Sequence, residues 1–396
     1  MQPHMGRGRF QIAASGCFKG DRSCSPYVVL RHRVAQKIIP LINERPMSIR
    51  ELSAELDLPT DLITEHIEKM LSCRYVEEVQ ADGKTLYKPA FTILTLEDQR
   101  RLQPLLEELS SDITAVIAES MPKVREAIKQ VRCIKAGYEL PQTEYIVIMV
   151  YALTRAFSEA LEKEGYVIRG KEMPSGYFIV SALEEGLIDL GDEWTWGHFS
   201  RYGRYEFATH GAPAPMSVRH AFPDLLWAWT ELVEWPELSR WAESLGDILI
   251  ALVDRPILVK ELASQLGRSG VDLLRDLTLL RELEYIQVKG YGEEAEIGLA
   301  APVFTVSDVR LIKDVAMDVS RELLDTLREK YHRVEEVYRE LSPARNGIDL
   351  REAFEPISMI IRIVASRKLI EGGVIKAPPI RKDGGEYTTW VAEVEQ

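Results

Sequence analysis

The residues best suited to bind a ligand gather in residues 191–235, a stretch that holds five of the seven tryptophans. Aromatic side chains alternate along one run, and a second aromatic run returns after a turn. This alternation predicts a β-hairpin with aromatic rings on one face. Such a face, with a few polar groups, suits a small aromatic or cationic ligand. The residues expected to bind that ligand are Trp194, Trp196, His198, Tyr202, Tyr205 and His210.

Metal ligation is the second chemistry that this stretch could support. His198, His210 and His220 lie within it, near Asp192 and Glu193. No two of the histidines have the three- or four-residue spacing that places two ligands on one helix face. Surface or hairpin positions explain them more simply, so we expect neither a metal site nor a cofactor.

The four cysteines are irregularly spaced. Cys17 and Cys24 lack the close spacing of a structural zinc site, and four scattered cysteines are too few for a disulfide framework. The sequence therefore predicts free thiols at Cys17, Cys24, Cys73 and Cys133.

The composition is that of a globular protein, with 46% hydrophobic residues, 28% charged residues and a net charge of −13. None of the common phosphate-binding, dinucleotide-binding, hydrolase or zinc-protease motifs occurs. The longest apolar run, Tyr145–Leu153, is much shorter than the roughly 20 residues of a membrane-spanning helix, and the N-terminus has no signal-peptide pattern. We expect a cytoplasmic protein with no membrane partner and no enzymatic activity.

Two helices and a hairpin are predicted between residues 48 and 88. Ser48 and Glu51 have the spacing of a capping box, which starts the first helix. Residues 57–59 interrupt it, and Thr60 starts the second helix. Two short strands follow, joined by an Asp-Gly turn that favours a hairpin. An amphipathic helix over residues 34–42 precedes them all.

This order of elements resembles the winged helix-turn-helix transcriptional regulators, and it is most similar to the small ArsR-like and MarR-like repressors. The resemblance covers about residues 28–95. It implies a domain that binds double-stranded operator DNA, with the second helix of the turn in the major groove and the hairpin as a wing.

The same pattern recurs 210 positions later in the chain. Residues 45–79 align with 255–289 without a gap, with six of the 35 positions identical, and the helix starts at Thr95 and Thr305 keep the same offset. We infer an internal duplication that makes the monomer a pseudo-dimer, with further dimerisation left open. The expected fold is mainly α with small β, built from two winged helix-turn-helix units with long helices and related by a pseudo-two-fold axis.

Residues 191–235 have no counterpart in the second repeat, so the alternative to a ligand pocket is a hairpin that packs over the junction of the halves.

The predicted domains follow one another along the chain. The domains are a basic flexible tail (1–27), a first winged-helix domain (28–95), a helical and small β region (96–190), the aromatic hairpin (191–235), a second winged-helix domain (236–306), and a long helix, an apolar helix and a small β element (307–396).

Long helices are expected to join the two halves. The apolar stripe of residues 307–341 suits packing against residues 96–131, and the alternative is burial within its own half. Pro104 and Pro122 are expected to kink or break the earlier helix.

DNA binding depends mainly on Lys and Arg side chains near phosphates. The first recognition helix is acidic and the second is richer in arginine, while Arg7 and Arg9 in the tail suit a minor groove. The residues expected to contact DNA are Thr60, Thr64, Lys69, Lys84, Arg268, Ser269, Arg275, Arg7 and Arg9. The sequence thus predicts a transcriptional regulator, gated by a ligand at the aromatic hairpin. The alternative is a scaffold that binds proteins, which the acidic first helix would suit.

Overall fold

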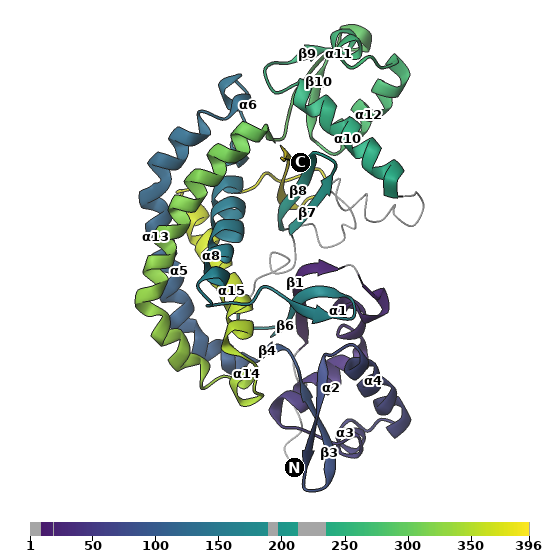
Figure 1. Ribbon diagram of the computed structural model, residues 1–396, viewed down its shortest axis with the longest axis vertical. Coiled ribbons are helices and arrows are strands. Elements are labelled where there is room, and N and C mark those ends of the chain that lie inside the picture. The colour runs from purple at the N-terminus through teal and green to yellow at the C-terminus, as the bar shows by residue number, and fades with distance from the viewer. Residues whose placement is uncertain (1–8, 19, 189–196, 213–234, 396) are drawn as a thin grey trace. The chain divides into compact units, whose positions relative to one another are not determined.

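The computed structural model describes residues 9–18, 20–188, 197–212 and 235–395 (Figure 1). They form two compact units, and each unit is assembled from three separate stretches of the chain. Unit 1 comprises Met1–Ile113, Ser158–Thr195 and Leu324–Ala365, and unit 2 comprises Thr114–Phe157, Trp196–Leu323 and Ser366–Gln396.

The fold class expected from the sequence is wrong, because the chain has a mixed α/β fold. Helices hold 56% of the described residues and strands 20%, and the described strands form several small sheets with no support for two winged-helix units. Strand pairings that the sequence does not predict explain the difference. β1 (Phe10–Phe18) and β13 (Glu386–Glu393) each pair with a strand that is distant in the sequence.

The largest sheet of unit 1 has the strand order β1-β6-β4, and β5 also pairs with β6. β1 runs antiparallel to β6 (Gly176–Glu184) along its whole length. The prediction of a flexible tail is therefore wrong for the described residues 10–18, which are held by backbone hydrogen bonds. The remaining small elements of this part are η1 (Arg22–Cys24), α1 (Pro26–Val29), β4 (Thr92–Leu94) and β5 (Lys171–Met173).

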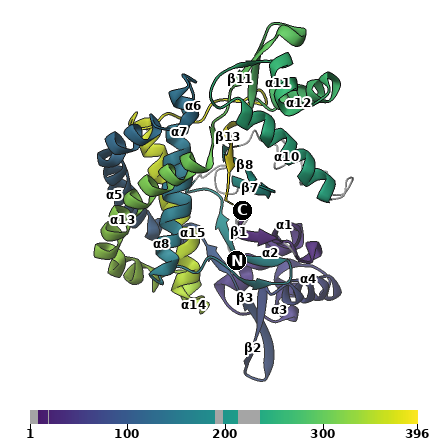
Figure 2. The ribbon, with the colours of Figure 1, turned by 45° about the horizontal axis from the view of Figure 1, so that its top comes forward.

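A helix–turn–helix and a hairpin form the rest of the N-terminal part of unit 1 (Figures 1 and 2). The predicted capping box is confirmed: Ser48 Oγ accepts a hydrogen bond from the Glu51 N–H, and Glu51 Oε2 accepts one from the Ser48 N–H at 2.8 Å. Ile63 and Ile67 place one face of the second helix in the core. The elements are α2 (Arg33–Glu44), α3 (Ile49–Leu56), α4 (Thr60–Ser72), β2 (Val76–Ala81) and β3 (Lys84–Pro89).

The two long helices, α5 (Leu96–Ile128) and α13 (Val306–Tyr338), are each continuous. The predicted break of α5 at Pro104 and Pro122 is wrong. Each proline removes one intrahelical hydrogen bond, but the packing of the buried apolar face stabilises the helix more than that loss weakens it. Within unit 1 the helices are joined by Lys330 Nζ, which lies 2.6 Å from Asp112 Oδ2. Unit 1 also contains α8 (Ser158–Lys163), α14 (Ser342–Arg345) and the first part of α15 (Leu350–Glu371).

Unit 2 contains a sheet of strand order β12-β13-β8-β7 and a smaller sheet of order β10-β11-β9. β8 lies between β13 and β7 and is antiparallel to both. The strands are β7 (Gly197–Tyr202), β8 (Tyr205–Ala212), β9 (Ile257–Leu258), β10 (Ile286–Lys289), β11 (Glu296–Leu299) and β12 (Val303–Phe304). The helices are α6 (Arg132–Lys135), α7 (Gln142–Tyr145), the π-helix η2 (Ile146–Phe157), α10 (Trp235–Ala251), α11 (Val259–Leu266), α12 (Gly270–Glu282) and the short η4 (Gly292–Glu294).

The prediction of four free thiols is wrong, because Cys24 and Cys73 form a disulfide within unit 1. Their sequence separation is 49, so no short spacing motif marks the pair. The bond joins η1 to the residue that ends α4. Cys17, which is exposed, and Cys133, which is buried, are free thiols.

Candidate functional site

Helix α12 of unit 2 presents side chains that the fold does not use. Leu273, Leu277 and Leu280 bury one side of the helix. On the other side Val271 is 79% exposed, Leu274 is 50% exposed and the Arg275 side chain is 67% exposed. An apolar pair beside an arginine on one helix face is a surface that a partner molecule could cover.

The N-terminus of α12 is fixed by its neighbours. Gly267 ends α11 in the left-handed conformation, with φ of 61°, and Ser269 Oγ accepts a hydrogen bond from the Asp272 N–H. The turn between the two helices is therefore only three residues long, and α12 is held rigidly against α11.

Arg268 stabilises the fold and is not part of the exposed face of α12. Its guanidinium lies 2.5 Å from a carboxylate oxygen of Asp276, which is fully buried. The indole N–H of Trp241 donates to the same carboxylate at 3.0 Å. Arg275 Nε lies 3.3 Å from Asp276 as well, but most of the Arg275 side chain stays in solvent.

Helix α4 of unit 1 is poorly suited to contact the phosphate backbone of DNA. Lys69 donates to Ser23 Oγ at 2.9 Å, and the Thr64 hydroxyl donates to the Thr60 carbonyl oxygen at 2.9 Å. Three acidic residues are exposed along the same helix. They are Asp61, Glu65 and Glu68.

The remaining residues expected to contact DNA are spread over unit 1. Lys84 is exposed at the tip of the β2–β3 hairpin, where Asp82 and Gly83 have positive φ. Arg9 is exposed and lies 3.8 Å from Glu185. Arg7 lies outside the described residues.

The predicted aromatic hairpin is present as β7 and β8, but the residues expected to bind a ligand do not share one face. Side chains alternate between the two faces of a strand. Tyr202 lies opposite Tyr205 on one face, whereas His210 points to the other. Trp194 and Trp196 lie outside the described residues, as does the side chain of His198.

Tyr202 and Tyr205 belong to the core of unit 2. Both are buried, and the Tyr205 hydroxyl donates to Asp247 at 2.7 Å. The ring of Tyr205 packs against Gly246, where a Cβ atom would lie 2.2 Å from a ring carbon. Burial raises the pKa of Tyr205 well above its usual range, and the hydrogen bond to Asp247 adds to the effect.

The opposite face of this sheet, which we call the His210 face, is covered by α7 and η2. The Tyr145 hydroxyl and His210 Nδ1 are 3.0 Å apart. Arg155 Nη2 lies 2.5 Å from Glu206 Oε1, on the same face as His210. The Arg155 guanidinium carbon also lies 5.0 Å from the ring centre of Tyr151 and 4.7 Å from that of Phe199.

Three buried polar atoms on the His210 face have no hydrogen-bond partner among the described residues. They are the Tyr151 hydroxyl, Thr388 Oγ1 and Trp390 Nε1. Burial raises the pKa of Tyr151 to about 12, so its hydroxyl stays protonated at neutral pH. No sequence pattern indicated these three residues, because Tyr151 lies in the longest apolar run and Thr388 and Trp390 lie in a strand whose bounds the sequence does not predict.

Metal binding and membrane spanning gain no support from the part of the chain that the structure describes. No group of three or more His, Cys, Asp or Glu side chains is placed there to hold a metal ion. None of the helices in these ranges has the length and hydropathy needed to cross a membrane.

Comparisons with known proteins give no match: no family model, no curated protein and no solved structure is similar to the chain.

Proposed function

We propose that the chain is a DNA-binding transcriptional regulator in which α12 of unit 2 enters the major groove. The exposed face of α12 is the observation that carries this proposal. A short turn and a capped N-terminus hold the helix in place, and Val271, Leu274 and most of the Arg275 side chain are exposed to solvent. The second helix of a helix–turn–helix reads bases in this way.

The side chains of this face match the chemistry of base edges. The forked guanidinium of Arg275 can donate two hydrogen bonds to a guanine, and the apolar side chains of Val271 and Leu274 can contact thymine methyl groups. Arg268 and Asp276 would support the contact indirectly, since they hold the first turns of α12 together. We therefore expect a site with G and T at neighbouring positions.

Unit 1 would contribute less to this binding. Lys84 is placed at a hairpin tip to meet a phosphate, but the acidic residues of α4 would repel one. The proposal is thus an asymmetric regulator with one reading helix. It keeps the cytoplasmic location expected from the sequence, because the protein must reach DNA.

The acidic face of α4 supports a second candidate function. Asp61, Glu65 and Glu68 are exposed together on one helix, and a basic segment of another protein would complement them. In this case the chain would act as a protein-binding scaffold.

Selection from a random duplex library separates the two functions. The winning duplex is titrated at two salt concentrations with wild type, Arg275→Ala and the control Arg321→Ala. Arg321 is an exposed arginine of α13 that pairs with Asp318. We expect Arg275→Ala to weaken specific binding about tenfold to a hundredfold, in line with the ~1–3 kcal/mol of a bidentate contact, and Arg321→Ala to leave it unchanged. Without enrichment, and with binding no tighter than ~10⁻⁶ M, the regulator is rejected in favour of the scaffold.

A further inference from the structure

The unpaired polar atoms of the His210 face indicate a binding site within unit 2. A buried polar group without a partner costs roughly 1–3 kcal/mol, and native proteins keep few of them. Tyr151, Thr388 and Trp390 are all almost fully buried, and each has one such atom. The hydroxyls of Thr209 and Thr389, on the opposite face of the same sheet, are also without a partner among the described residues, but only on the His210 face does an indole N–H share this condition.

The three side chains are neighbours. Thr388 and Trp390 are two positions apart on β13, opposite His210 and Ala208, so they share the His210 face. The ring centres of Trp390 and Phe199 are 5.9 Å apart.

Tyr151 reaches the same place from the covering helix. Arg155 lies over the rings of both Tyr151 and Phe199, which brings Tyr151 above the sheet. The indole of Trp390 is close enough to the Tyr151 hydroxyl to offset a small part of the rise in its pKa. Neither atom has a hydrogen bond of normal length in the described structure.

The helix that covers this face is a π-helix over Ile146–Phe157. π-Helical turns are rare and occur frequently at functional sites. The hydroxyl of Thr154 donates to the Met149 carbonyl oxygen at 2.6 Å, five residues earlier.

We infer that unit 2 binds a small neutral aromatic carbonyl compound between η2 and the His210 face. The Trp390 N–H can only donate, so the ligand must accept a hydrogen bond there, and the hydroxyls of Tyr151 and Thr388 can donate or accept. The rings of Tyr151, Phe199 and Trp390 favour an aromatic ligand. A neutral compound fits better than an anion, because Glu206 already balances the charge of Arg155. This inference does not depend on DNA binding.

The first test uses the ligand-free protein. Tyr151→Phe and Thr388→Val remove an unpaired hydroxyl with little change in shape, so we expect the melting temperature to stay the same or rise. Tyr205→Phe is the matched control, since its hydroxyl is bonded to Asp247 and its loss should lower the melting temperature. If Tyr151→Phe and Thr388→Val lower it as the control does, the hydroxyls already hold partners such as fixed waters, and the inference is overturned.

The second test uses benzamide as the probe, in a thermal-shift and calorimetric titration up to millimolar concentrations. We expect benzamide to stabilise wild type and Tyr205→Phe, with affinity at least about tenfold weaker in Tyr151→Phe and Thr388→Val, as for the loss of one hydrogen bond of about 1.4 kcal/mol. Absence of any stabilisation of wild type, or equal affinity in all four proteins, overturns the inference.

Discussion

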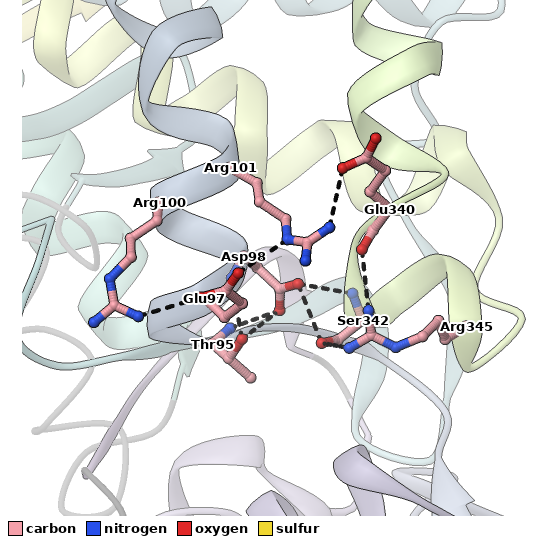
Figure 3. A network of polar contacts seen from close by, with 8 residues as sticks. All are labelled: Thr95, Glu97, Asp98, Arg100, Arg101, Glu340, Ser342 and Arg345. Atoms are coloured by element: carbon pink, nitrogen blue, oxygen red, sulfur yellow. Dashed lines mark hydrogen bonds and ion pairs between the residues drawn. The ribbon is translucent and has the colours of Figure 1, made fainter.

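Asp98 and Ser342 are 244 positions apart, and two hydrogen bonds join them: Asp98 Oδ1 accepts from the Ser342 backbone N–H at 2.8 Å and from its hydroxyl at 3.1 Å (Figure 3). The other oxygen of Asp98 accepts from the N–H and the hydroxyl of Thr95. One buried carboxylate thus caps the N-termini of both α5 and α14 in unit 1. A negative charge is favourable at both helix ends.

Unit 2 contains the same arrangement. Asp308 Oδ2 accepts hydrogen bonds from the N–H and the hydroxyl of Thr305 at the start of α13. Asp308 Oδ1 accepts one from the Arg132 N–H, at the start of α6, at 2.9 Å. In each unit an aspartate therefore ties the beginning of a long helix to a short helix from a distant part of the chain.

We expect Asp98→Ala to lower the free energy of unfolding by about 3 kcal/mol. Each lost cap accounts for ~1 kcal/mol, and the buried N–H of Ser342 left without a partner adds ~1–3 kcal/mol, of which part is relieved by local adjustment. Denaturant unfolding measures the change. Asp314→Ala, at an exposed position of α13, is the control and should change stability little. Equal effects of the two substitutions would show that Asp98 does not cap both helices.

Short sequence patterns predicted these helix starts. They could not predict the contacts between residues that are far apart in the sequence. The spacing of Thr95 and Asp98, or of Ser48 and Glu51, specifies hydrogen bonds within one turn, so the sequence alone is enough to place them. No short spacing in the sequence predicts the hydrogen bonds that Ser342 donates to Asp98. For the same reason β1 was mistaken for a tail, since its partner β6 lies far along the chain.

The candidate ligand site was missed for a related reason. Alternating aromatic residues correctly predicted the β7–β8 hairpin, but the turn between Tyr202 and Tyr205 decides which face each side chain takes. That register places the two tyrosines in the core and His210 on the other face. The remaining residues of the His210 face come from β13 and η2, which no short-range pattern connects to the hairpin.

The disulfide between Cys24 and Cys73 should contribute about 2–4 kcal/mol to the stability of unit 1, because it closes a loop of some fifty residues in the unfolded chain. The double substitution of both cysteines by serine should lower the unfolding midpoint, and so should reduction of wild type. The double variant should not respond to the reductant. Cys17→Ser is the control, since this thiol is exposed and free. A wild type that is insensitive to the reductant would contradict the prediction, provided that thiol titration confirms that the bond was broken.

The capping carboxylate of Glu51 should make unit 1 less stable in acid. Hydrogen bonds from the Ser48 N–H, the Ser48 hydroxyl and Arg45 lower the pKa of Glu51 from 4.5 to about 2. A lowered folded-state pKa contributes stability above about pH 4.5, and this contribution is lost as the pH falls towards 2. The melting temperature of Glu51→Gln should therefore lie below that of wild type at pH 7, and the difference should vanish near pH 2.

Ser48→Ala is the matched variant for this titration. It keeps the Glu51 charge and the backbone N–H bond but removes the hydroxyl that donates to Glu51 Oε2 at 2.7 Å. The pKa of Glu51 should rise, so Ser48→Ala should begin to lose stability at a higher pH than wild type. If the difference between Glu51→Gln and wild type does not change with pH, the carboxylate makes no cap in solution.

Substitutions of Arg268 and Arg275 should differ in their effects on stability and on DNA binding, although both are arginines near the start of α12. Only 19% of the Arg268 side chain is exposed, and it pairs with the buried Asp276. Removing the Arg268 guanidinium takes the closest positive charge away from the buried Asp276 carboxylate. Arg268→Ala should therefore lower the free energy of unfolding by roughly 3 kcal/mol. Arg275→Ala should lower it by less than about 1 kcal/mol, because Arg275 is mostly in solvent.

The same two variants distinguish an effect on the stability of the fold from an effect on the proposed DNA binding. At a temperature where both variants are folded, Arg275→Ala should lose specific DNA binding, and Arg268→Ala should keep its sequence preference with a weaker overall affinity, because its guanidinium does not reach the surface that α12 presents. Circular dichroism melts and duplex titrations on the two proteins measure both effects. A loss of sequence preference in Arg268→Ala with no change in stability would mean that Arg268 leaves Asp276 and contacts a base itself.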